Sequence, residues 1–129
     1  MNAFPIPITA VFAALLALLL VVLSVRVTLL RRRKKVSLLD GGDAELTRAM
    51  RVQGNFIEYV PLALALIGMA EWLRAPVWLV YVLAVLLLLT RISHAFGITL
   101  GKFPARAFGS GGTWLVLVVA ALVVLVRVA

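Results

Sequence analysis

One long apolar stretch near the start of the chain limits the possible folds more than any other feature. It covers about residues 8–30, a length that lets a helix cross a hydrocarbon layer of about 30 Å. A basic run at residues 31–35 follows this stretch, whereas a cleavable signal peptide carries its positive charge in front and a small-residue cleavage site behind. We therefore predict a retained transmembrane helix.

Three further stretches predict spans, at about residues 45–73, 77–100 and 108–127. The short connection after the second span indicates that the second and third spans are adjacent and antiparallel. Residues 101–112 contain Pro104 and four glycines, which is typical of a loop, although the last apolar run reaches back to Ala107. Since 64% of the 129 residues are hydrophobic and 14% are charged, the chain is too apolar for a water-soluble domain. The expected fold is an all-α membrane protein, a single domain formed by a four-transmembrane-helix bundle.

The basic residues predict the orientation of the chain. Five of the thirteen lie at residues 31–35, and Lys102 and Arg106 follow the third span, whereas the connection between the second and third spans carries Arg74 alone. Basic loops remain on the cytoplasmic side, so both termini should lie on the non-cytoplasmic side. We interpret the net charge of +8 as this topology signal rather than as a nucleic-acid-binding surface. A multi-pass protein of a bacterial inner membrane is expected.

The second span carries a polar stripe. Spacings of three and four place Arg48, Arg51, Asn55 and Glu58 on one helix face. Glu58 would lie about 10 Å deeper than Arg51, where a carboxylate costs several kcal/mol unless it is paired. We expect Glu58 to face protein rather than lipid. For Arg48, contact with lipid headgroups is the simpler interpretation.

The third span has two ionisable residues, Arg91 and His94. Arg91 should reach a depth comparable to that of Glu58, so an ion pair between them is plausible. Together these groups would line a cavity for an anionic ligand, open to the cytoplasm. The structural alternatives are a buried pair that fixes helix register, a packing role for His94, and an interhelical hydrogen bond for Asn55.

The pattern Arg51-x-x-x-Asn55-x-x-Glu58-Tyr59-x-Pro61 resembles the second-helix signature of the MAPEG family, the membrane-associated proteins in eicosanoid and glutathione metabolism. The resemblance extends over the whole chain in length, order of spans and the basic loop after the first span. The third-span pattern Arg91-x-x-His94-x-x-Gly97 looks closer to the bacterial-type, microsomal glutathione transferase-like members.

This resemblance implies a homotrimer with glutathione, as co-substrate, bound between neighbouring subunits. The residues expected to bind it are Arg51, Asn55, Glu58, Tyr59, Arg91 and His94. Asn55 would act as both donor and acceptor, and Glu58 would accept from the amino group of glutathione or from Arg91. The resemblance also assigns a catalytic role to Arg106, with Lys102 as a possible substitute. A cation at this position would stabilise the glutathione thiolate.

Three functions remain open from the sequence. The first is a glutathione-dependent transferase or peroxidase acting on lipophilic electrophiles or hydroperoxides. The second is a non-catalytic lipid-binding or accessory subunit, because His94 and Ile98 replace tyrosines of animal members. The third, a small multidrug-type transporter, would need a glutamate in the first span, which is uncharged over residues 8–25. No metal is expected, since the chain has no cysteine and no dense carboxylate or histidine cluster.

Overall fold

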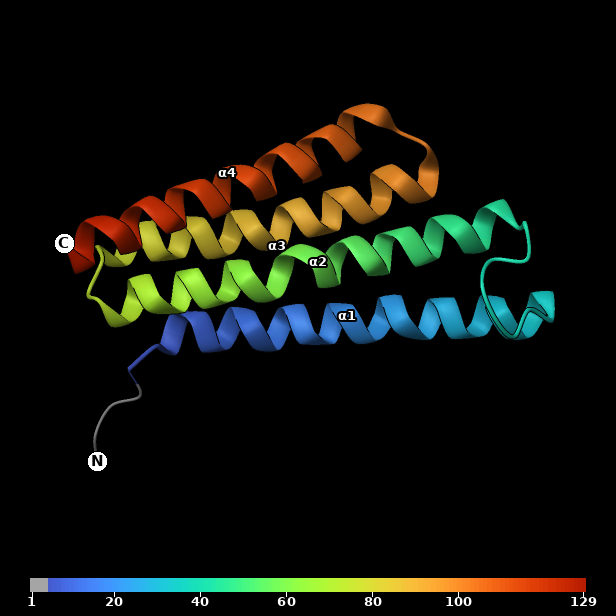
Figure 1. Ribbon diagram of the computed structural model, residues 1–129, viewed down its shortest axis with the longest axis horizontal. Helices are drawn as coiled ribbons and strands as arrows, with labels where there is room; N and C mark the ends of the chain where they lie inside the picture. The colour runs from blue at the N-terminus through green and yellow to red at the C-terminus, as the bar shows by residue number, and fades with distance from the viewer. Residues whose placement is uncertain (1–4) are drawn as a thin grey trace.

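The computed structural model describes residues 5–129, and the regular structure in this range is entirely helical. The long helices run antiparallel to one another, as Figure 1 shows. These are α1 (Pro7–Lys34), α2 (Ala44–Trp72), α3 (Val77–Leu100) and α4 (Phe103–Val128). Each is long and apolar enough to cross a membrane. The predicted four-span architecture is therefore confirmed for the described chain, with α3 packed on α4, α2 and α1.

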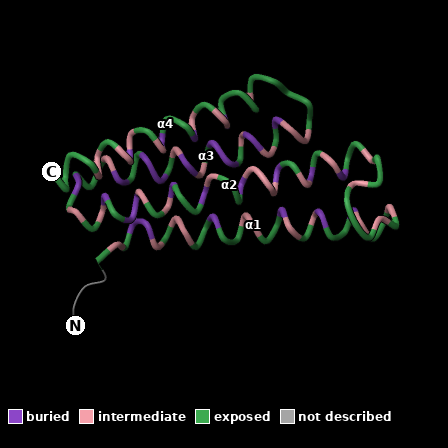
Figure 2. Tube along the Cα trace, viewed as in Figure 1, coloured by how far each residue is buried: buried purple, intermediate pink, exposed green. Residues whose placement is uncertain are grey.

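Apolar side chains lie both inside the bundle and on its outer surface. The core between the helices includes Leu16, Ala63, Ile67, Leu87 and Val116, all of which are almost fully buried. The outward faces of the same helices expose many large apolar side chains, and Figure 2 shows exposed positions along the outside of every helix. Such a surface suits lipid, because acyl chains solvate apolar side chains that water would not.

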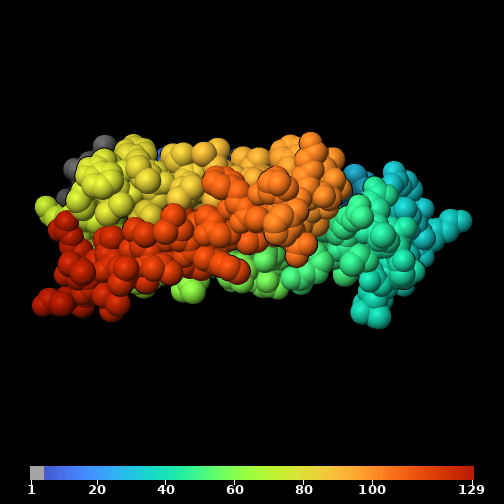
Figure 3. Space-filling view, turned by 90° about the horizontal axis from the view of Figure 1, so that it is seen from above, coloured from blue at the N-terminus to red at the C-terminus, as the bar shows by residue number. Residues whose placement is uncertain are grey.

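The two ends of the bundle differ in charge. One end, which we call the basic end, holds the α1–α2 and α3–α4 connections, with residues 31–35 and Lys102. The α1–α2 connection projects beyond the α3–α4 connection, as Figures 1 and 3 both show. The opposite end holds the α2–α3 connection and the C-terminus. At the basic end, α1 and α2 therefore extend further than α3 and α4 do.

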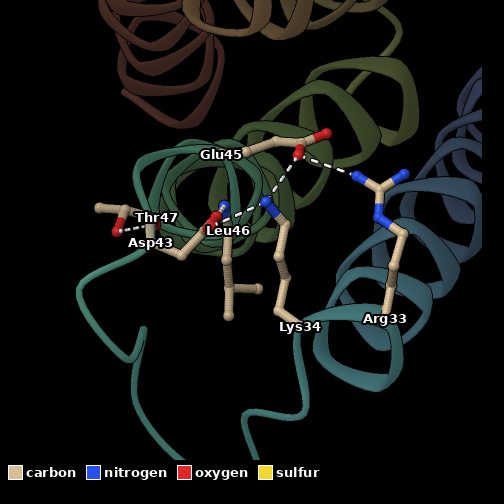
Figure 4. Close-up of polar contacts among 6 residues, drawn as sticks. All are labelled: Arg33, Lys34, Asp43, Glu45, Leu46 and Thr47. Atoms are coloured by element: carbon tan, nitrogen blue, oxygen red, sulfur yellow. Dashed lines mark hydrogen bonds and ion pairs between the residues drawn. The ribbon is translucent and has the colours of Figure 1, made fainter.

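Ion pairs clamp α1 to α2 at the basic end (Figure 4). Lys34 Nζ lies 2.8 Å from Asp43 Oδ2, and Arg33 Nη2 lies 2.9 Å from Glu45 Oε2. Asp43 is also the N-cap of α2, since its side chain accepts a hydrogen bond from the Leu46 N–H at 2.9 Å. The Lys34 ammonium and this backbone donor hold the pKa of Asp43 below its usual value of 3.8. The cap is therefore ionised at neutral pH.

A second contact joins α1 to α2 at the opposite end. The carboxylate of Glu71, near the end of α2, accepts hydrogen bonds from the backbone N–H groups of Ile8 and Thr9, each at 2.8 Å. These N–H groups belong to the first turn of α1, where no helical carbonyl is available to them. Glu71 therefore fixes the start of α1 against α2.

The α4 helix begins at Phe103, several residues earlier than the expected span from 108. Two of the glycines that suggested a loop, Gly109 and Gly112, in fact allow close helix packing, because they face α3. A Cβ atom at Gly109 would lie only 2.5 Å from His94 Cβ, and one at Gly97 would lie 2.7 Å from Arg106 Cα. Small residues at a helix contact let two backbones approach in this way. The first turn of α4 is held further by a 2.9 Å hydrogen bond from Ser93 Oγ to the Ala105 carbonyl.

Candidate functional site

A cavity of about 360 Å³ opens at the basic end between α2, α3 and α4. It brings together four of the residues predicted to form the site. These are Arg51 and Asn55 from α2, His94 from α3 and Arg106 from α4. The other residues that line it are Thr47, Arg48, Gly97, Ile98, Gly101, Phe103 and Ser110.

The helix arrangement explains how these side chains meet. Arg48, Arg51 and Asn55 follow one another at spacings of three and four along α2, so they share the face that borders the cavity. The close contact between α3 and α4 sets His94 and Arg106 on the opposite wall. The first turn of α4 also lies at the cavity, and Lys102, its N-cap, makes no side-chain cap bond there. This end of a helix is the positive end of its dipole.

The cavity is strongly cationic. Three guanidinium groups line it, from Arg48, Arg51 and Arg106, and none of its described lining residues is acidic. Guanidinium groups remain charged at any physiological pH and present forked donors to carboxylates. The cavity therefore fits an anionic ligand with more than one acceptor group.

Arg91 lies buried behind this cavity, with 2% of its surface exposed. Its Nη1 donates to Asn55 Oδ1 at 2.7 Å, and its Nη2 donates to the Gly109 carbonyl at 2.7 Å and to Thr113 Oγ1 at 2.5 Å. All three acceptors are neutral. Arg91 therefore contributes a further positive charge close to the cavity without lining it.

The expected ion pair between Glu58 and Arg91 does not form in the single chain. The Glu58 side chain is half exposed, and its Oε1 lies 3.7 Å from Arg51 Nη1. The two residues lie at similar depths, but Arg91 is directed towards α4, where Gly109 and Thr113 offer acceptors. Nor does the cavity reach Glu58 or Tyr59. The expectation that Glu58 faces protein is thus wrong for the isolated chain.

Three residues of the site were not predicted from the sequence. Arg48 lines the cavity, although lipid-headgroup contact was the simpler interpretation. Ser110, in the early turns of α4, was not singled out, although it lies within the expected fourth span. Thr113 is fully buried and binds Arg91; its signal was a lone hydroxyl at the start of an apolar run, four residues after Gly109.

Comparison with known proteins places this architecture in a family. The model of the MAPEG family matches residues 9–126. The inner membrane protein YecN of Escherichia coli strain K12 is 37% identical over 110 residues, which are 85% of this chain and 84% of YecN. YecN from E. coli O6:H1 strain CFT073 matches to the same extent. With four apolar helices, this protein is accordingly a multi-pass inner membrane protein, and it belongs to the MAPEG family.

Proposed function

We propose that the protein is a glutathione-dependent membrane transferase or peroxidase that acts on lipophilic electrophiles or hydroperoxides. The observation that carries this proposal is the cavity between α2, α3 and α4, with three arginines and Asn55 on its wall. Glutathione has two carboxylates and two amide carbonyls, which suit such a set of donors. Membership of the MAPEG family, whose name includes glutathione metabolism, supports the same choice of ligand.

Each wall of the cavity has a role in this proposal. Arg48 and Arg51 bind carboxylate groups through their forked donors, and Asn55 contributes an amide group. Arg106 lies at the positive end of α4 and stabilises the glutathione sulfur as a thiolate. The lipophilic substrate arrives from the bilayer, where the outer helix faces are already solvated by lipid.

The chemistry follows from the thiolate. In a transferase reaction, the thiol loses its proton, the sulfur forms a bond to the electrophilic carbon, and the leaving group departs with the bonding electrons. In a peroxidase reaction, the sulfur attacks one peroxide oxygen, the O–O bond breaks, and the released alkoxide is protonated to an alcohol. A second glutathione then reduces the oxidised sulfur, which yields the disulfide and water.

We further propose a homotrimer in which a neighbouring subunit covers Glu58. This glutamate lies 14 residues from Trp72 at the far end of α2, about 21 Å along the helix, and so within the hydrocarbon layer. A half-exposed carboxylate at that depth is costly against lipid. A covering subunit would also place Glu58 and Tyr59 near a site formed between chains. The basic end faces the cytoplasm in this arrangement, as the distribution of positive charge favours.

Glutathione binding by the purified protein in detergent tests the proposal. We expect saturable binding by calorimetry, and we expect Arg51→Ala to weaken it about 100-fold, because a forked donor to a carboxylate is lost. Arg127→Ala is the matched control, since Arg127 is exposed at the far end of α4. Absence of binding at millimolar glutathione, or equal affinity in the two variants, would refute the proposed site.

A second experiment distinguishes catalysis from the alternative function, lipid binding without catalysis. Ile98 on the cavity wall favours this alternative, because its side chain offers no hydroxyl group to a ligand. We expect Arg106→Gln to lower the conjugation rate at pH 7 about 100-fold while glutathione still binds. Removing the cation raises the thiol pKa, so the pH–rate profile should move to higher pH. Lys102→Gln should leave the profile unchanged. If Arg106→Gln leaves the rate and the profile unchanged, the proposed role of Arg106 is refuted. If wild-type protein binds glutathione without conjugating it, the non-catalytic alternative is favoured.

A further inference from the structure

The side-chain amide of Asn55 is held in one orientation. Its Oδ1 accepts a hydrogen bond from Arg91 Nη1 at 2.7 Å. A guanidinium group has donors only, so the amide oxygen must be the atom that faces Arg91. The amide nitrogen, Nδ2, is then directed away from Arg91, and it donates no hydrogen bond to any residue in the range 5–129. Asn55 also lines the cavity, so this nitrogen is free for a ligand.

Thr113 holds the side chain of Arg91 in place, and Arg91 in turn orients the amide group of Asn55. Arg91 Nη2 donates to Thr113 Oγ1 at 2.5 Å and to the Gly109 carbonyl at 2.7 Å. Thr113 is 1% exposed, and its Oγ1 also lies 2.8 Å from the Gly109 carbonyl and 3.1 Å from Thr90 Oγ1. The hydroxyl proton therefore has acceptors on both sides, which leaves the oxygen lone pair for Arg91. The hydrogen bonds connect α4 to α3 and then to Asn55 on α2.

We propose that Thr113 is a positioning residue that acts through Arg91 and holds Asn55 with its amide nitrogen, a hydrogen-bond donor, directed to the cavity. The floor of the cavity then selects a ligand group that accepts a hydrogen bond, such as a carboxylate or an amide carbonyl, and rejects an ammonium group. This differs from the expectation that Asn55 serves as both donor and acceptor. For the identity of the ligand, the inference rests on the proposed function. It assigns a carboxylate or carbonyl of glutathione to Asn55 and excludes its amino group from this position.

The orientation can be measured without any ligand. The chain has two asparagines, Asn2 and Asn55, so labelling the side-chain amide nitrogen of asparagine with ¹⁵N gives two pairs of side-chain NH₂ cross-peaks in a ¹H–¹⁵N NMR spectrum. We expect Thr113→Val to shift the Asn55 signal and Thr113→Ser, which keeps the hydroxyl, to restore it. Thr28→Val is the matched control, because Thr28 Oγ1 also donates to the carbonyl four residues earlier but lies outside this network. An Asn55 signal that is unchanged by Thr113→Val would overturn the inference.

A second variant tests the selection of the ligand group. Asn55→Asp keeps the shape of the side chain, gives Arg91 an anionic partner and presents an acceptor to the cavity. We expect a higher apparent Tm together with about 100-fold weaker glutathione binding, because the ligand acceptor now meets a carboxylate oxygen. Glutathione affinity within a factor of about two of wild type would overturn the assignment of Asn55 as donor. If wild-type protein does not bind glutathione, the proposed function fails, and the NMR result alone still decides the role of Thr113.

Discussion

Replacing Gly109 by alanine is expected to lower the stability of the bundle by about 3 kcal/mol, the upper part of the range for overpacking in a core. A Cβ atom at this position would lie 2.5 Å from His94 Cβ and 2.7 Å from His94 Cα. The neighbouring atoms include backbone, which cannot rotate away as a flexible side chain can. The two helices must therefore separate, and the hydrogen bond from Arg91 to the Gly109 carbonyl is disturbed with them.

Gly111→Ala is the matched control for this experiment. Gly111 lies two residues further along α4, and nothing lies within 4 Å of the position that its Cβ would occupy. Alanine there should stabilise the helix by roughly 0.5–1 kcal/mol, since glycine is a poor helix former. Apparent Tm values in the same detergent measure both changes. Equal Tm values for the two variants would contradict the packing that we describe between α3 and α4.

Arg91→Lys is expected to destabilise the protein by about 3 kcal/mol and to remove most of its ligand affinity. The guanidinium group reaches Asn55 on α2 with one nitrogen and both Gly109 and Thr113 on α4 with the other. A lysine ammonium is a single point and cannot span these two sides. Buried acceptors on at least one side would lose their donor, which costs about 1–3 kcal/mol for each group.

Arg127→Lys provides the control for this substitution, since Arg127 is exposed near the end of α4. It should leave both the apparent Tm and glutathione binding unchanged. Calorimetry and thermal unfolding of the two variants, compared with wild type, measure the expected differences. If Arg91→Lys keeps wild-type stability, the hydrogen bonds of Arg91 contribute little and its role must be reconsidered.

The sequence was informative about depth in the membrane. Hydropathy predicted the four spans, and spacings of three and four along α2 correctly placed Arg51 and Asn55 on one face of the cavity. These features depend only on where a residue lies along a single helix, and that position can be read from the order of residues in the sequence. The grouping of His94 with these residues also follows from its position about one turn nearer the basic end of α3 than Arg91.

The partner of Arg91 could not be predicted in the same way. Glu58 and Arg91 lie at comparable depths, but pairing also depends on how each helix is rotated about its own axis, and packing sets that rotation. Gly109 and Gly112 of α4 permit close contact with α3, which brings the Gly109 carbonyl to Arg91. The same glycines had suggested a loop. A glycine-rich composition that is typical of turns thus belongs to a helix interface here. Hydropathy alone does not distinguish glycine in a turn from glycine at a close helix contact.

The bond between Glu71 and the start of α1 has a consequence for the order in which the chain can be assembled. Ile8 and its acceptor are 63 residues apart, so the first turn of α1 lacks its acceptor until nearly all of α2 has been synthesised. At the other end, Lys34 and Asp43 are close in the chain and can pair early. The α1–α2 hairpin is thus the shortest nascent chain in which the contacts between α1 and α2 can form at both ends of the two helices. Biogenesis should accordingly proceed by insertion of this hairpin, onto which α3 and α4 then pack.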